Sequence, residues 1–337
     1  LPGRPELTGS AKSFLTAVKN KRESLSASRD LYQSLILPLA PKHLSRLILV
    51  PDGPLHLVPF SALINGDGDL LNEQLTLSTA PSATVYAALK TAPQRTAADK
   101  PFLGVAYSPV VAGPNEKESS TRGLTALRQG NAGTLKFARE EVTEAASSFG
   151  SKSVTLAGGD ASEAKLKAEP LSEFKVIHLA AHGIGDEMEP DRAALVLLPG
   201  NNEEDGLWQA REIRHSRLNA DLIVLSACET GSGRLQGEEG VMNLARAFLI
   251  AGARSVVASL WSVEDDSTAT LMGYFYEHLA AGLTVNESLR QAQIDFIREY
   301  KGRAQPYYWA GFEVIGDGTR RLETTKVNSE TTGTNLR

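Results

Sequence analysis

The stretch Val176–Gly183 reads VIHLAAHG, and the stretch Leu222–Gly231 reads LIVLSACETG. Each begins with an apolar run and ends in polar residues and a glycine. Short apolar runs of this kind are typical of parallel strands that are buried on both faces. In open α/β sheets, ligands bind beyond the carboxyl ends of the strands. If the two strands are neighbours, His182 and Cys228 emerge at the same edge of one sheet.

Further strand candidates, separated by helical patterns, lie on both sides of this pair. The strand candidates are residues 102–107, 153–156, 255–261 and 312–315. Apolar residues recur at helical spacing over 137–149 and 241–251, and a capping box at Thr284 opens a further helix that runs to about Tyr300. Six apolar strands that alternate with helices predict a mostly parallel six-stranded sheet. Helices on both faces would make this an α/β fold, a three-layer α/β/α sandwich.

Three regions differ in composition. Residues 1–100 are predicted to be an N-terminal extension with helices and strands, which forms either a small separate unit or part of the same sheet. Its first 40 residues or so read as helical, and short strand candidates follow at 47–50, 55–63 and 75–77. Residues 101–320 carry the alternating pattern. Residues 321–337 contain few apolar side chains and are predicted to be disordered. The long polar stretch 108–136 inside the second region is typical of a loop that is either functional or disordered.

Composition excludes several classes of protein. The formal net charge of −5 and the absence of a basic block argue against direct binding of nucleic acid. No apolar run reaches the roughly 20 residues that span a bilayer, and no signal-peptide core follows Leu1, so we expect no membrane association and a cytoplasmic protein. The single cysteine excludes an internal disulfide and argues against a cysteine-based zinc site.

The single cysteine and its neighbours also suggest a chemistry. A free thiol has a pKa of about 8.5, so a nearby imidazole is needed to form the thiolate nucleophile at neutral pH. We expect His182 to act as that base for Cys228. The backbone N–H groups of Gly183 and Cys228 are candidates for an oxyanion hole, in which one donor contributes roughly 3 kcal/mol.

The histidines allow a second interpretation. His178 and His182 form an H-x-x-x-H pattern, which on a helix would place two zinc ligands on one face. The flanking residues predict a strand, no glutamate follows the first histidine and no third ligand is evident. We therefore predict no metal and no cofactor, and we expect His178 to be a packed, hydrogen-bonded strand residue.

The sequence resembles the CHAT family, the caspase-like domain often attached to tetratricopeptide repeats in bacteria. The matching runs are LVPDG at 49–53, LVPFSAL at 57–63, HLAAHG at 178–183, LSACETG at 225–231, EGV at 239–241, ARAFLIAGA at 245–253, LWSV at 260–263 and YWAGF at 308–312. The resemblance implies a caspase- and separase-like fold and a Cys–His dyad, with His182 and Cys228 at the family's catalytic positions. It also implies a protein substrate cut through a thioester, and a tetratricopeptide-repeat or other regulatory partner.

Substrate preference can be predicted only from the loops that the resemblance assigns to the specificity pocket. Ser226 lies two residues before Cys228, and the loop after the next strand offers Glu264 and Asp265. Asp186, just past His182, either adds another carboxylate to the cleft or belongs to a solvated loop. Acidic groups attract Arg and Lys, so we predict cleavage after a basic residue. A competing interpretation gives Asp265 a role at a helix N-terminus.

Two functions remain open from the sequence. The first is a regulated cysteine endopeptidase that cuts specific protein partners. The alternative is a caspase-like scaffold or interaction module with little or no turnover. The intact pair His182 and Cys228 favours the enzyme. A non-proteolytic thiol hydrolase would use the same two residues, but the family resemblance argues against it.

Overall fold

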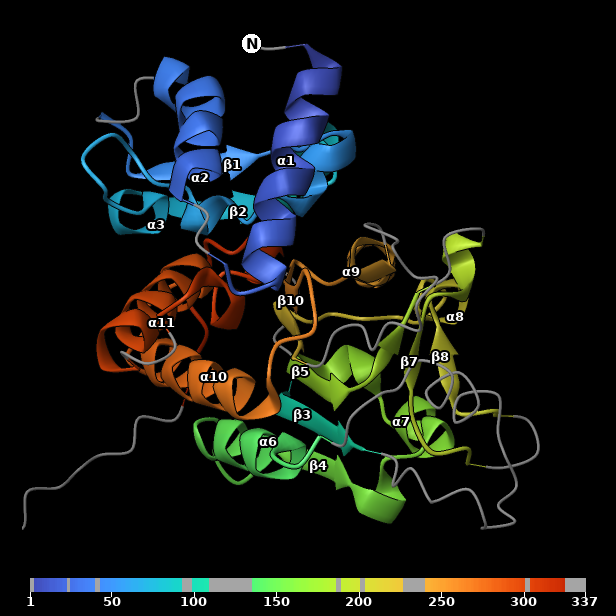
Figure 1. Cartoon of the computed structure of the whole chain (residues 1–337). Coiled ribbons are helices and arrows are strands. Elements are labelled where there is room, and N and C mark those ends of the chain that lie inside the picture. Colours follow the sequence, from blue (N-terminus) through green and yellow to red (C-terminus); the bar gives the residue numbers. More distant parts are fainter. Residues whose placement is uncertain are drawn as a thin grey trace, which may run out of the picture.

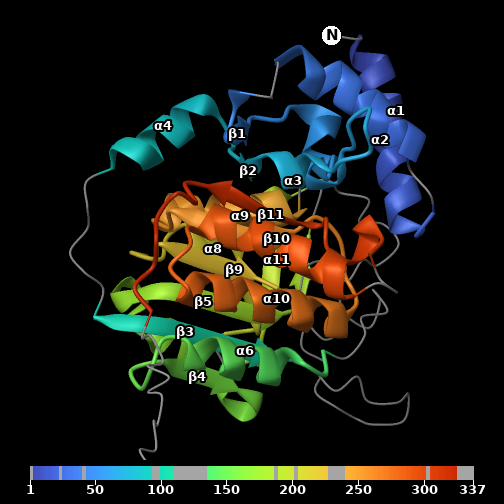
Figure 2. The ribbon, with the colours of Figure 1, turned by 90° about the vertical axis from the view of Figure 1, so that its left-hand side faces the viewer.

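The computed structural model describes residues 3–22, 25–39, 43–92, 99–108, 135–185, 189–200, 204–226, 240–300 and 304–324. Their centre is an eight-stranded sheet with the strand order β1-β2-β11-β10-β9-β5-β3-β4 (Figure 1, Figure 2). The strands are β1 (Arg46–Leu49), β2 (Thr76–Thr79), β3 (Lys100–Tyr107), β4 (Val154–Ala157), β5 (Phe174–Ala181), β9 (Leu222–Leu225), β10 (Ser255–Ser259) and β11 (Phe312–Gly316). Neighbouring strands are parallel except β10 and β11, which are antiparallel.

The predicted fold class is confirmed. All six strands expected from the apolar runs are present, and they form the part of the sheet from β11 to β4. Strands β5 and β9 are buried on both faces, with Ile177, Leu179 and Ile223 fully inaccessible to solvent. Continuous burial explains why Leu222–Leu225 is an uninterrupted apolar run, and why β5 carries apolar residues on both sides of His178 rather than alternating.

Helices cover both faces of the sheet. On one face, α6 (Ala138–Ser147), α10 (Asp265–Ala280) and α11 (Val285–Glu299) pack on a core that contains Val176 and Val224. On the other face, α7 (Glu163–Ala168), α8 (Ala210–Ile213) and α9 (Gly240–Ala251) pack on a core that contains Ile177 and Ile223. Consecutive strand residues therefore point into different cores, as the pleat of a strand requires. Figure 2 shows α6, α10 and α11 lying together on one side of the strands.

The N-terminal region adds two strands to the same sheet. It contributes α1 (Arg4–Lys19), α2 (Leu25–Leu31), α3 (Leu71–Gln74) and α4 (Ala83–Thr91) around β1 and β2. The ladder between β2 and β11 consists of one residue pair, Ile315 with Thr79, and the Thr79 hydroxyl also donates to the Val314 carbonyl. The strand predicted at 55–63 is wrong, since the chain forms 3-10 helices at Gly53–Leu57 and Phe60–Ala62. Pro54 and Pro59 explain the difference, because proline fixes φ and removes a ladder donor.

A small second sheet follows β5 directly. Its strands β6 (Gly183–Ile184), β7 (Ala194–Val196) and β8 (Leu207–Gln209) are antiparallel neighbours. At the other end of the chain, Arg321 forms an isolated bridge with Thr284, and Leu322 is buried. Residues 325–337 and most of the long polar stretch, 109–134, lie outside the described residues. Within the described ranges, none of the helices is long and apolar enough to cross a membrane.

Gly104 of β3 gives a test of how closely α6 packs on the sheet. A Cβ atom at this position would overlap Val142 Cγ1 and would lie 2.8 Å from Phe102 Cε1, both in buried side chains. We expect Gly104→Ala to lower the free energy of unfolding by about 1–3 kcal/mol in urea denaturation. Gly159→Ala is the control, because nothing lies within 4 Å of its added Cβ. Equal free energies of unfolding for the two variants would contradict close packing of α6 on β3 at Gly104.

Candidate active site

Two neighbouring strands end at the predicted site. Strands β5 and β9 are parallel and pair from Val176 with Leu222 to Leu179 with Leu225. His182 is the first residue after β5, and Ser226 is the first after β9. The carboxyl ends of both strands therefore meet at one edge of the sheet, as predicted. Cys228 and Asp186 lie outside the described residues.

His182 and Gly183 connect the two sheets. His182 is 2 % exposed, and its carbonyl oxygen accepts a hydrogen bond of 2.8 Å from the Val196 N–H. Gly183 is paired with Leu195 across β6 and β7. Hydrogen-bonded and non-hydrogen-bonded pairs alternate in an antiparallel ladder. Because His182 and Val196 form a hydrogen-bonded pair, the Gly183 N–H points away from β7.

His178 lies at the centre of a buried polar cluster, which confirms that it is a packed, hydrogen-bonded strand residue. Its Nδ1 is 3.0 Å from the Tyr276 hydroxyl, and its Nε2 is 3.0 Å from Ser226 Oγ. Glu141 Oε1 also lies 2.8 Å from Nε2. His178 thereby links α6 and α10 to the residue that follows β9. The partners Glu141 and Tyr276 have no local sequence signal, because they are distant from His178 along the chain.

Tyr276 lies in an environment that keeps its hydroxyl protonated. Burial, and the nearby Glu141 carboxyl group, raise the pKa of Tyr276 well above its usual value. The neutral hydroxyl forms a hydrogen bond of 3.0 Å with His178 Nδ1. On the other side of the ring, His178 Nε2 faces Glu141 and Ser226. Ser226 is 4 % exposed, and its hydroxyl oxygen is within hydrogen-bond distance of this histidine.

The predicted specificity residues after β10 have separate partners. Asp265 Oδ2 accepts the Phe137 N–H at 2.9 Å, at the start of α6. Burial raises the pKa of Asp265 from its ordinary value. Glu264 instead forms an ion pair of 2.5 Å with Lys21, which follows α1. Both carboxylates lie just beyond β10, which is the parallel neighbour of β9.

Three carboxylates gather elsewhere in the described part of the chain, at Glu163, Glu204 and Glu212. The Lys167 ammonium lies among them, at 2.8, 2.6 and 3.1 Å from these three side chains. The Lys167 ammonium thus supplies the positive charge that a group of three carboxylates would otherwise obtain from a bound metal ion. The predicted site residues do not belong to this cluster.

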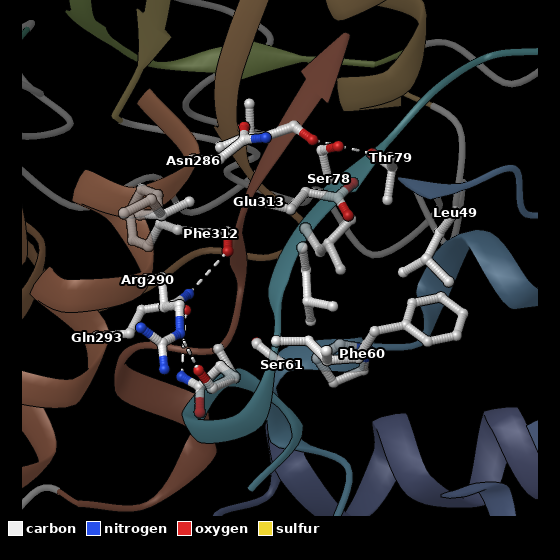
Figure 3. A pocket seen from close by; sticks show the side chains of 18 residues that line it. Leu49, Phe60, Ser61, Ser78, Thr79, Asn286, Arg290, Gln293, Phe312 and Glu313 are labelled. Atoms are coloured by element: carbon white, nitrogen blue, oxygen red, sulfur yellow. Dashed lines mark hydrogen bonds between the residues drawn. The ribbon is translucent and has the colours of Figure 1, made fainter. Parts of the chain in front are cut away.

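A small cavity lies between β2, β11 and α11 (Figure 3). Its volume of about 40 Å³ suits a few water molecules rather than a substrate. The lining includes the buried side chains of Ser78, Asn72 and Asn286, and also Glu313. Burial raises the pKa of Glu313 to about 8. None of the predicted site residues that the structure describes lines this cavity.

Comparison with known proteins identifies related sequences and folds. A family model described as the CHAT domain matches residues 25–317. Tetratricopeptide repeat protein 28 of Mus musculus is 34 % identical over 114 residues, which is 34 % of this chain and 5 % of that protein. The Homo sapiens protein of the same name is 32 % identical over 114 residues, 34 % of this chain and 4 % of that protein. The chain thus spans a small part of the curated relatives that it matches.

Two solved structures match this chain. Gingipain R, described as an Arg-specific cysteine proteinase, has a TM-score of 0.53 at 11 % identity, covering 95 % of this chain and 77 % of that chain. The Saccharomyces cerevisiae separase–securin complex has a TM-score of 0.45 at 13 % identity, covering 80 % of this chain and 16 % of that chain. At these identities the gingipain similarity supports the fold alone.

The raised pKa of Glu313 predicts a pH-dependent stability. Between the ordinary pKa of 4.5 and about 8, the folded state holds a proton that the unfolded state releases, so stability falls as pH rises through this window. We expect Glu313→Gln to remove this loss and to be more stable than the wild type at pH 9 by about 2–4 kcal/mol. At pH 4 the difference should be small.

The measurement is the melting temperature from pH 4 to pH 9. Glu140→Gln is the control, because it makes the same charge change at an exposed position of α6. Parallel pH curves for the wild type and Glu313→Gln would show that Glu313 ionises in the folded protein as it does in the unfolded chain.

Proposed function

The chain belongs to the CHAT domain family, and on that premise we propose that it is a cysteine endopeptidase with Cys228 as nucleophile and His182 as general base. The proposal rests on the register of β5 with β9. Val176 pairs with Leu222 across β5 and β9, a separation of 46 residues, and His182 and Cys228 are separated by the same 46 residues. If the register continues beyond the strand ends, the imidazole and the thiol lie side by side.

The proposed reaction follows from these two residues. His182 takes the proton of the Cys228 thiol, and the thiolate attacks the carbonyl carbon of the scissile peptide. The Gly183 and Cys228 N–H groups stabilise the negative oxygen of the tetrahedral intermediate. This intermediate collapses to a thioester as His182 gives its proton to the departing amine. Water, deprotonated by His182, then hydrolyses the thioester and restores the thiol.

We place the preference for a basic residue on Glu264. Its side chain is 37 % exposed, and it holds a lysine ammonium at the edge where β10 ends, beside β9. Asp265 is half-buried and accepts a backbone N–H, which makes it a weaker candidate. Ser226 and Asp186 stay predicted members of the pocket.

The alternative function is a caspase-like scaffold with little or no turnover. The curated relatives are named for their tetratricopeptide repeats, and the match covers a small part of their length. Those names favour binding of protein partners without naming an activity. A regulatory repeat partner and a cytoplasmic location remain part of the proposal under either function.

A positional-scanning peptide library at neutral pH tests the enzyme. We expect cleavage after Arg or Lys, with kcat/KM at least about 10³-fold lower in both Cys228→Ala and His182→Gln. His215→Gln is the control, because this histidine is exposed at the end of α8. Undiminished cleavage by Cys228→Ala would refute the proposed nucleophile. Cysteine-dependent cleavage after other residues would retain the dyad and remove Glu264 from the pocket.

A further inference from the structure

The residue that pairs with Glu264 has an unusual backbone conformation. Helix α1 ends at Lys19, with Asn20 as its C-cap. The Lys21 N–H donates to the Val18 carbonyl and the Arg22 N–H to the Ala17 carbonyl, each at 2.9 Å. These two bonds form a Schellman motif, in which Lys21 occupies the position that glycine usually takes. Lys21 has φ = 54°, and it is the one non-glycine residue with positive φ among those described.

A lysine is locally unfavourable at this position. The left-handed conformation brings Cβ close to the backbone, which is why glycine and asparagine are common there. Such conformations persist where surrounding contacts hold them, and they often mark functional sites. The contacts of the Lys21 side chain should therefore compensate for its backbone conformation.

Those contacts form a cage around the ammonium group. Lys21 Nζ is 2.5 Å from Glu264 Oε1, 4.6 Å from the ring centroid of Tyr307 and 4.7 Å from that of Tyr308. The two rings lie nearly perpendicular, at 84°. A carboxylate and two aromatic faces are a recognised arrangement for binding a cation. The hydrogen bond with Glu264 raises the pKa of Lys21, which keeps the ammonium charged.

Tyr307 is held by contacts that do not involve Lys21. The Tyr307 hydroxyl donates to the Ser262 carbonyl at 3.0 Å, and the Trp261 indole N–H donates to the Tyr307 carbonyl at 2.9 Å. These bonds join the loop after β10 to the 3-10 helix Pro306–Tyr308 before β11. The Tyr307 ring would therefore keep its position, available to another cation, if Lys21 withdrew.

The location of the cage connects it to the candidate active site. Strands β10 and β11 are antiparallel, with Ser259 opposite Phe312. The end of β10 and the start of β11 thus lie at one edge, which is also the edge where β5 and β9 end. Lys21 and Glu264 side chains are each 37 % exposed, so their ion pair is partly solvated. Partly solvated ion pairs are weak, and another cation can displace this one.

We propose that Glu264, Tyr307 and Tyr308 form a binding site for a Lys or Arg side chain of a protein substrate, and that Lys21 occupies this site as an internal competitor. The inference rests on the proposed peptidase function and specifies how it is restrained. Movement of the end of α1 away from the loop after β10 would open the site to substrate.

The test uses variants of the whole chain that suit the left-handed backbone. Lys21→Gly and Lys21→Asn remove the ammonium at a position where both residues are tolerated, so the melting temperature should be retained. Lys19→Ala is the control, because it removes the same charge from an exposed position at the end of α1. The substrates are two fluorogenic peptides that differ only in Arg or norleucine before the scissile bond.

We expect Lys21→Gly and Lys21→Asn to lower KM for the Arg peptide about five- to tenfold relative to Lys19→Ala, with kcat unchanged. KM for the norleucine peptide should not change. Adding Glu264→Gln to Lys21→Gly should abolish the decrease in KM for the Arg peptide. Identical KM values in the Lys21 and Lys19 variants would overturn the proposal, as would an equal gain for the norleucine peptide.

A binding measurement separates this inference from the proposed function. Fluorescein-labelled versions of both peptides are titrated with Cys228→Ala protein, with and without Lys21→Gly, and followed by fluorescence polarisation. Tighter binding of the Arg peptide alone, about five- to tenfold, would support the cage even if no variant cleaves peptide. Unchanged binding would overturn the cage even if the wild type is an active peptidase.

Discussion

The parallel pairing of β5 with β9 is the constraint on which the candidate site depends. It fixes the register Val176 with Leu222, and so it brings the residues after both strands to one edge of the sheet. A slip of one residue would turn the side chains of either strand toward the opposite core. Burial of both faces makes such a slip costly. The two cores therefore act together to specify where His182 and the chain leading to Cys228 emerge.

Polar groups buried next to this edge strengthen the same register. His178 joins α6, α10 and the end of β9 through contacts with Glu141, Tyr276 and Ser226. A buried polar group without a partner costs free energy, so each member of the cluster restricts the others. The position of Ser226 is thereby fixed two residues before the proposed nucleophile. Rigid support of this kind is what a preorganised catalytic site requires.

Six of the eight strands of the large sheet could be predicted as one layer, because apolar runs such as Leu222–Leu225 report burial directly. The sequence left open whether residues 1–100 extend that sheet, as β1 and β2 do. The sequence did not reveal β6, β7 and β8, since strands of two or three residues are too short to show the two-residue alternation of apolar and polar side chains. The strand expected at 55–63 was wrong because two prolines override the apolar pattern. Contacts between distant residues, such as Tyr276 with His178 and Lys21 with Glu264, leave no local signal. The second of these pairs spans 243 positions.

The single cysteine makes a direct test of the dyad practicable. The measurement is the rate at which the folded protein reacts with iodoacetamide between pH 5 and pH 10, for the wild type and for His182→Gln. We expect a wild-type profile shifted to acid relative to a free thiol with a pKa of about 8.5, and loss of that shift in the variant. Superimposable profiles near the free-thiol value, or a thiol that reacts only on unfolding, would contradict a Cys228–His182 dyad.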